Sequence, residues 1–265
     1  MKSIALVKYS LDVAEIRVDA ATQEMRLRGV PERFGDIDKS VVEAAVRVKE
    51  VAGGTVHLLC FGPTAARTAV KDLLAMGADD ATIVDDPFRG ALEGALVARI
   101  LETAIRRYGE FDLVFAGFAS DDGYTHQTPG RLAERLGLPL VSYAHDVGVE
   151  EKGVRVVREL EDCLETVLIH LPAVISIGEQ AVEGRRVTLL EAMKAQKKPL
   201  TLFSLDDLGF DVEALEHVRT MHELDRHGIV VQRKQQMLEG SSLESLADAL
   251  IDQLVIDEIL TEGAS

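Results

Sequence analysis

The polar side chains with the clearest chemical potential lie in residues 120–130, which read Ser-Asp-Asp-Gly-Tyr-Thr-His-Gln-Thr-Pro-Gly. An apolar run at 113–117 precedes them and is typical of a strand buried on both faces of a parallel sheet, while residues 131–136 read as a helix. A strand, a glycine-containing loop and a helix N-terminus form an anion site, because free backbone N–H groups and the helix dipole attract negative charge. The candidate ligand is a phosphate. The alternative is a solvated loop in which Thr128 caps the helix and Pro129 lies in its first turn.

These residues do not form a recognisable catalytic group. His126 would need an acidic partner to act as a general base, and the spacing supplies none, so a donor or solvated role fits it equally well. Asp121 and Asp122 could hold a metal, but neighbouring acids in a turn usually bond their own backbone. The sequence lacks the GxGxxG and P-loop motifs, so neither a standard dinucleotide fingerprint nor a phosphoryl-transfer site is predicted.

Composition restricts the class of protein. The 265 residues carry a formal net charge of -16, which argues against a nucleic-acid partner because few cations are present to neutralise phosphates. Cys60 and Cys163 lie far apart without CxxC spacing, so we expect neither a disulfide scaffold nor a zinc site. An apolar run of 18 residues and a cleavable signal are both lacking, so we predict no membrane insertion and a cytoplasmic location.

Alternating elements must position the loop. The pattern predicts strand 4–7, a hairpin within 15–28, helix 39–51 capped by Asp38, strand 55–60, a helix ending at 74, strand 81–84, helix 94–108, strand 113–117 and helix 131–136. Right-handed crossovers stack such a chain as a doubly wound parallel sheet, whose ligands bind at the carboxyl ends of strands. We therefore expect a nucleotide-sized anion site near Val7, Lys8, Tyr9, Cys60, Phe61, Gly62 and residues 122–130.

The pattern changes after residue 138. Residues 154–159 and 166–170 predict an antiparallel pair, and residues 172–178 predict a further buried strand. The chain then reads as irregular and basic from Glu183 to Pro199.

The C-terminal segment reads as an arm. Residues 241–260 predict an amphipathic helix that follows the polar segment 211–240. Its apolar stripe must be buried somewhere, and a partner subunit is a natural place. We expect an α/β nucleotide-binding domain at 1–205 and an arm at 206–265.

Five segments in order resemble one family, the β subunit of electron transfer flavoprotein. They are the opening strand with its Val7-Lys8 step, the helix at 38–50 (DKSVVEAAVRVKE), AMGAD at 75–79, Gly117 with DGYTHQ at 122–127, and VTLLEAMKAQKKP at 187–199. The resemblance covers nearly the full chain. It implies an adenine-nucleotide α-hydrolase-like version of the doubly wound sheet with a C-terminal helical arm.

The resemblance also implies cofactors. A partner α subunit would carry most of the site for the redox FAD, at its interface with this chain, and the arm would wrap onto that subunit. The sheet of this chain would hold a second nucleotide, which is AMP in simple carriers and a second FAD, reduced by NADH, in the electron-bifurcating branch. Residues 28–31 and 122–123 resemble the bifurcating branch and residues 127–128 the AMP branch, so both stay open with a lean towards FAD.

Individual positions inherit expected roles from this resemblance. Residues on the family's nucleotide contacts are Val7, Lys8, Cys60, Asp122, Thr125, Gln127 and Thr128, and the same loops supply Tyr9, Phe61, Gly62, Gly123 and His126. Leu189 falls on the loop that docks into partner dehydrogenases, and residues 158–159 resemble a pair on the strand facing the α subunit. Expected partners are the α subunit, an acyl-CoA-type or other flavin dehydrogenase such as those of fatty acid oxidation, and a quinone oxidoreductase or low-potential acceptor.

Two alternatives accompany this prediction. A universal-stress-like sensor that binds adenine nucleotides shares the sheet architecture, but its glycine-rich phosphate loop is missing from this sequence. For Leu189 and the basic run at 194–198, the alternative is an ordinary solvated surface loop. Departures from the family pattern include Phe118 and Ala119 in place of a polar pair, and Gly35 where Asn is usual.

Overall fold

The structure is a computed structural model that describes residues 1–89, 92–151, 153–178, 181–217, 228 and 236–260. The chain divides into two compact units. The first comprises Met1–Arg17 with Met25–Arg226, and the second Val18–Glu24 with His227–Ser265. The predicted boundary at residue 205 remains a proposal.

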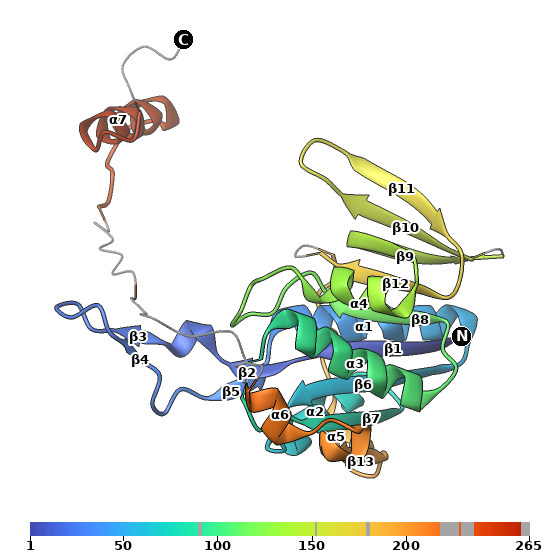
Figure 1. Cartoon of the computed structure of the whole chain (residues 1–265). Helices are drawn as coiled ribbons and strands as arrows, with labels where there is room; N and C mark the ends of the chain where they lie inside the picture. The colour runs from blue at the N-terminus through green and yellow to red at the C-terminus, as the bar shows by residue number, and fades with distance from the viewer. Residues whose placement is uncertain (90–91, 152, 179–180, 218–227, 229–235, 261–265) are drawn as a thin grey trace. The chain divides into compact units, whose positions relative to one another are not determined.

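A mostly parallel sheet forms the centre of the first unit (Figure 1). Its order within the described part of the chain is β11-β10-β9-β12-β8-β1-β6-β7-β13. The strands are β1 (Lys2–Val7), β6 (Thr55–Gly62), β7 (Asp80–Asp85), β8 (Leu113–Gly117), β9 (Leu140–Glu150), β10 (Gly153–Glu159), β11 (Leu164–Ile169), β12 (Ala173–Ile177) and β13 (Leu200–Phe203). All neighbours from β9 to β13 in this order run parallel, whereas β10 runs antiparallel to β9 and β11.

Helices cover both faces of the sheet. On one face, α1 (Asp36–Ala52) and α2 (Ala66–Ala75) bury their apolar stripes in a core that contains Leu58 and Phe115. On the other, α3 (Gly94–Tyr108) and α4 (Thr128–Leu136) pack against Ile4 and Val114. The stripes recur at three- and four-residue spacing, which places them on one side of each helix. The predicted doubly wound sheet is confirmed.

The remaining elements of the first unit are short. They are β2 (Tyr9–Leu11), η1 (Val13–Glu15), β4 (Met25–Arg26), β5 (Glu32–Phe34), α5 (Leu189–Ala195), η2 (Asp206–Leu208) and α6 (Val212–His217). β3 (Arg17–Val18) lies at the junction with the second unit, and β3 and β4 fall within the predicted hairpin. The prediction of an irregular segment from Glu183 to Pro199 is wrong in part, because α5 occupies residues 189–195.

The second unit contains α7 (Leu243–Ile256), within the predicted tail helix. Ser242 caps it, since its hydroxyl accepts from the Ser245 amide at 3.2 Å. Large apolar side chains along α7 are exposed, including Leu243, Leu250, Ile251 and Ile256. Most of the polar segment predicted at 211–240 lies outside the described residues.

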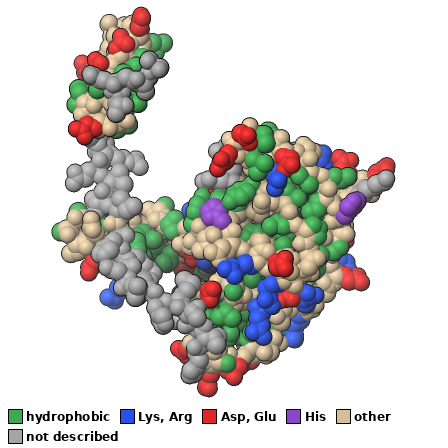
Figure 2. Space-filling model, turned by 45° about the horizontal axis from the view of Figure 1, so that its top comes forward, with side chains coloured by type: hydrophobic (Ala, Val, Ile, Leu, Met, Phe, Trp, Pro, Cys, Tyr) green, Lys and Arg blue, Asp and Glu red, His purple; other side chains and the backbone are tan. Residues whose placement is uncertain are grey.

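Charge is spread unevenly over the first unit. On the face drawn in Figure 2, carboxylates are scattered widely while lysines and arginines gather in patches. In the part of the chain that the structure describes, the helices are all too short or too polar to cross a membrane.

Candidate functional site

The sheet changes winding direction between β1 and β8. From β1 the chain passes through α1 to β6 on one side, whereas α3 carries it from β7 back across to β8 on the other. Ligands of doubly wound sheets bind in the crevice that such a reversal opens at the carboxyl ends of the strands. Lys8 follows β1 and Asp122 lies in the loop after β8, and the Lys8 Nζ lies 2.7 Å from the Asp122 Oδ1. The structure therefore brings these two predicted residues together at the carboxyl ends of β1 and β8, the expected position of such a crevice.

The electrostatics at Asp122 favour its charged form. Burial raises the pKa of Asp122, but the Lys8 ammonium and hydrogen bonds from Lys8, Ser120 and Gly123 outweigh burial and lower it overall. Both side chains remain partly exposed, so the pair is a polar wall accessible to a ligand. A carboxylate accepts hydrogen bonds and suits the hydroxyls of a ribose better than a phosphate.

Cys60 forms the next strand end. Val7 and Cys60 are register partners on β1 and β6, and both are buried. Burial raises the pKa of the Cys60 thiol to about 12, although a hydrogen bond from the Tyr9 backbone opposes this. A Cβ at Gly62 would lie 3.3 Å from the Cys60 Sγ, so glycine keeps the backbone close to the thiol. Cys60 is therefore a neutral side chain at physiological pH and part of the buried core beneath the strand ends.

Phe61 and Tyr9 have different surroundings. Phe61 packs in the core on the face opposite Cys60, because successive strand residues alternate sides. The Tyr9 ring lies against Phe34 with 5.3 Å between centroids, at the short β2–β5 pair. Burial, helped by the negative charge of Glu32, raises the pKa of Tyr9.

Asp38 is a polar residue of this site that sequence reasoning assigned differently. The predicted cap role is wrong: α1 begins at Asp36, its N-cap is Gly35, and Asp38 is the third helical residue. Its carboxylate accepts from the Lys8 amide at 2.8 Å and the Gly35 amide at 2.9 Å. Burial raises the pKa of Asp38 to about 7 against these two bonds. An acid three residues after a helix cap was the signal that could have found it.

Gly35 allows the loop after β8 to approach α1. A Cβ at this position would lie 1.8 Å from the Asp121 Oδ2, so the Asp121 side chain occupies the space that another residue would fill. Burial, together with the neighbouring acids, raises the pKa of Asp121 although Arg33 opposes it. The close approach of Asp121 therefore explains why glycine stands at position 35 of this chain.

His126 belongs to an aromatic cluster. Its ring lies 5.3 Å from Phe118 and 4.7 Å from Tyr124, and its Nδ1 is 3.2 Å from the Tyr143 hydroxyl. Tyr124, His126 and Tyr143 have φ values of 43°, 58° and 57°, in the left-handed region. Such strain persists where surrounding packing enforces it and is common at ligand sites.

A cavity of about 680 Å³ adjoins this cluster. Phe118, Tyr143, His145 and Gly178 line it together with acidic residues that include Glu159. Its volume lies in the range of sites for medium-sized organic ligands.

The start of α4 fits a phosphate. The predicted cap is wrong in detail, since the N-cap is Gln127 and Thr128 is already helical. The Gln127 Oε1 accepts from the Arg131 Nε at 3.0 Å, so among the described residues this terminus has no side-chain cap. Uncapped first-turn N–H groups can bind an anion. Gly123 and Thr125 lie on the exposed loop that leads to this terminus.

Leu189 lies away from these strand ends, at the first position of α5. Its side chain is 80% exposed, and Leu190 and Met193 are exposed as well. Thr188 caps the helix, accepting from the Glu191 amide at 3.3 Å, while the Glu191 carboxylate accepts from the Thr188 amide at 2.7 Å. The three exposed side chains form an apolar surface, here called the α5 surface.

Comparison with known proteins adds a decisive observation. A family model described as the electron transfer flavoprotein domain matches residues 27–208, more than half of the chain and all of the strand ends from β6 to β8. The chain belongs to the electron transfer flavoprotein family. The resemblance predicted from five short segments is confirmed.

Relatives within the electron transfer flavoprotein family narrow the subunit type. The chain is 32% identical to the electron transfer flavoprotein subunit beta of Thermoanaerobacterium thermosaccharolyticum, covering 81% of this chain and 83% of that one. It is 28% identical to the caffeyl-CoA reductase-Etf complex subunit CarD of Acetobacterium woodii, covering 96% and 98%. It is 32% identical to the acryloyl-CoA reductase electron transfer subunit gamma of Anaerotignum propionicum, covering 72% and 70%. The chain is thus a β-type subunit of electron transfer complexes.

Proposed function

We propose that this chain is the β subunit of an electron transfer flavoprotein heterodimer and holds an adenine nucleotide at its own strand ends. The observation that carries the nucleotide site is the pairing of Lys8 with Asp122 at 2.7 Å at the carboxyl ends of β1 and β8, in a loop that leads on to the uncapped start of α4. The electron transfer flavoprotein family supplies the functional class. The sensor alternative has no comparable support.

Different residues would bind the phosphate, the ribose and the adenine of this nucleotide, each according to its chemistry. Thr128 and Gly130 offer backbone N–H groups to the phosphate, and Asp122 accepts from the ribose hydroxyls. Val7 and Cys60 supply the buried apolar packing beneath the adenine, while Asp38 holds the Lys8 backbone in place. These roles involve binding and orientation, without proton transfer by a side chain.

The redox FAD would lie at the interface with the α subunit. Bound FAD supplies the electron-accepting and electron-donating chemistry, and the protein sets its orientation and electrostatics. Electrons would come from an acyl-CoA-type or other flavin dehydrogenase and pass to a quinone oxidoreductase or a low-potential acceptor. The caffeyl-CoA reductase and acryloyl-CoA reductase named in two relatives support a partner that acts on CoA thioesters.

The second nucleotide is AMP or the adenylate half of a second FAD. Tyr9 and Phe34 fill space beside the β1 end, which favours the smaller AMP. The cavity of about 680 Å³ beside Phe118 and Tyr143 favours FAD, because it leaves room for a larger group close to the same loop. Oxidation of NADH and electron bifurcation follow only in the second case.

The ligand content of the co-expressed αβ complex tests this proposal. Acid releases the bound ligands, and chromatography separates and quantifies them. One FAD and one AMP per heterodimer identify a simple carrier, and two FAD identify a complex capable of bifurcation. A complex with redox FAD and no second nucleotide would overturn the strand-end site. Failure to assemble with any flavin-bearing subunit would overturn the heterodimer.

A further inference from the structure

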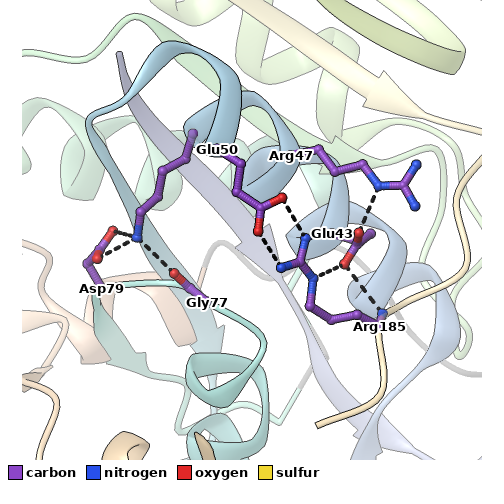
Figure 3. A network of polar contacts seen from close by, with 7 residues as sticks. Glu43, Arg47, Glu50, Gly77, Asp79 and Arg185 are labelled. Carbon is purple, nitrogen blue, oxygen red and sulfur yellow. Dashed lines mark hydrogen bonds and ion pairs between the residues drawn. The ribbon is translucent and has the colours of Figure 1, made fainter.

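One guanidinium ties the segment before α5 to α1. The Arg185 Nε donates to the Glu43 Oε2 at 2.6 Å, and one terminal nitrogen donates to the Glu50 Oε1 at 2.6 Å. The other terminal nitrogen reaches both carboxylates at 3.1 Å (Figure 3). A planar guanidinium can satisfy two carboxylates in this fork geometry, which a lysine ammonium cannot reproduce.

The partners of Arg185 differ in burial. The Glu43 side chain is 4% exposed and also accepts from the Arg47 Nε at 2.7 Å, whereas Glu50 is 54% exposed. Glu43, Arg47 and Glu50 all belong to α1, so among the described residues Arg185 is the one that joins these three side chains to another part of the chain. Removing the Arg185 side chain leaves Glu43 paired with Arg47 and with the Arg185 amide, which donates to the Glu43 Oε2 at 3.4 Å, so the variant loses the guanidinium bonds alone.

The chain is closely held at this point and exposed immediately after it. A Cβ at Gly184 would lie 2.7 Å from the Lys39 Cβ, so the backbone there lies directly against α1. Residues 186–190 are exposed throughout. Arg185 is consequently the last anchor before the α5 surface.

A second anchor holds the other end. Ala195 is fully buried, and the Lys198 Nζ donates to the carbonyls of Leu74 and Ala78 at 2.8 and 2.5 Å. The largely exposed span 186–194 thus bridges one anchor on α1 and another at the end of α2. The α2 anchor includes apolar burial, whereas the α1 anchor depends on ion pairs.

We propose that Arg185 is a positioning residue that fixes the orientation of the α5 surface for docking. This inference rests on the proposed function and on the expectation, implied by the family resemblance, that Leu189 contacts the partner dehydrogenase. The clamp holds residues 186–188 in one path, so the first turn of α5 presents Leu189 without a search over orientations. A pre-ordered docking segment binds more tightly because less conformational entropy is lost on association.

The test measures the αβ complex with Arg185→Ala, Glu50→Gln and, as matched control, Arg47→Ala. Arg47 contacts the same Glu43 carboxylate but lies on α1, so its loss leaves the link intact. Hydrogen–deuterium exchange of residues 186–196 should be at least fivefold faster in R185A, intermediate in E50Q and unchanged in R47A. Equal exchange in R185A and R47A would overturn the proposal.

Electron transfer gives the second readout. The probe is a purified short-chain acyl-CoA dehydrogenase that reduces the wild-type complex. R185A should raise the KM for the flavoprotein about fivefold to twentyfold with kcat within twofold, and flavin content should not change. A fall in kcat with unchanged KM would overturn a positioning role.

A double variant separates this inference from the proposed function. Leu189→Ala alone should raise the KM while leaving flavin content unchanged, and R185A should add little in the L189A background because both act through one surface. If L189A has no effect, docking by this surface is wrong. If L189A raises the KM and R185A does not, docking stands and positioning by Arg185 is wrong.

Discussion

Lys8 joins the end of β1 to α1 through its backbone amide and to the loop after β8 through its side-chain ammonium. Its amide donates to Asp38 on α1, and its ammonium pairs with Asp122 in the loop after β8. The backbone bond fixes where β1 ends, while the side chain holds the far wall of the crevice. A substitution at Lys8 therefore removes the ion pair and leaves the bond to Asp38.

Lys8→Met should deplete the second nucleotide. Loss of the ammonium leaves the Asp122 carboxylate uncompensated and releases its loop, so we expect at least tenfold weaker retention of that nucleotide. The redox FAD should stay at one per heterodimer. Chromatography of acid-released ligands from the αβ complex measures both.

Lys2→Met is the matched control for this change. Lys2 lies at the other end of β1, in an exposed pair with Glu110 at 3.8 Å. Exposed pairs contribute at most about 1 kcal/mol, so nucleotide content should match the wild type. Equal depletion in both variants would point to general destabilisation and would contradict a specific role for Lys8.

At the scale of elements, helix α1 serves two regions of the first unit. Its N-terminal turn carries Asp38 at the crevice, and its middle carries Glu43, which binds Arg185 from a segment 142 residues later. Burial raises the pKa of Glu43, but hydrogen bonds and charge from Arg185 and Arg47 outweigh it and lower the pKa below its ordinary value of 4.5. The carboxylate is therefore a stabilising group that acid removes.

Glu43→Gln should make the αβ complex less sensitive to acid. Because the folded pKa is depressed, the stabilisation by Glu43 is present above about pH 4.5 and is lost as pH falls through the folded pKa. We expect E43Q to cost roughly 2 kcal/mol at pH 7 and progressively less below pH 4.5. Thermal unfolding at pH 7, 5, 4 and 3.5 measures the difference.

Glu110→Gln, at an exposed position, is the control for this pH series. Its unfolding temperatures should follow the wild type at every pH. A constant gap between wild type and E43Q across the series would show that the Glu43 charge contributes nothing.

Periodicity explains which elements were predictable. Strands β1, β6, β7 and β8 are short apolar runs with both faces covered, and α1 and α3 carry regular stripes, so local sequence was sufficient. β13 was missed because it is the last strand of the sheet and alternates little, and β9 because it is only partly buried. Edge position is a tertiary property that local pattern does not encode.

The sequence was sufficient to predict where on the sheet the candidate site lies, but not which side chains contact one another there. Strand order placed Lys8, Cys60 and Asp122 at one edge of the sheet, as the rule for parallel sheets implies. The Asp38 bonds and the Gly35–Asp121 approach depend on how α1 lies against the loop after β8. The Arg185 clamp joins residues too distant in sequence for spacing arguments to reach.

At the scale of the whole molecule, α7 carries large exposed apolar side chains within the second unit. Leu243 and Ile256 are 87% and 72% exposed. Exposing this much apolar surface of a helix to water is unfavourable in free energy, and burial against another chain removes that cost. We therefore propose that the C-terminal arm at residues 206–265, which includes α7, binds the α subunit.

Leu250→Asp should weaken the heterodimer without unfolding the first unit. A charge on the apolar face opposes its burial, so we expect the dissociation constant of the αβ complex to rise at least tenfold. Glu244→Gln, in the first turn of α7, should leave it unchanged. Analytical ultracentrifugation at several concentrations measures both, and equal affinity for L250D and wild type would contradict the proposed role of the arm.

The rate at which a thiol reagent modifies Cys60 reports how often the strand ends around it open. A thiol reacts through its thiolate, and a buried group with a pKa of about 12 is shielded both by its protonation and by the strands around it. Cys163 is exposed and reacts at once, marking time zero in the same sample. The rate of the slow second phase of modification then measures how often the ends of β1 and β6 separate. A bound nucleotide that holds these strand ends together lowers this rate.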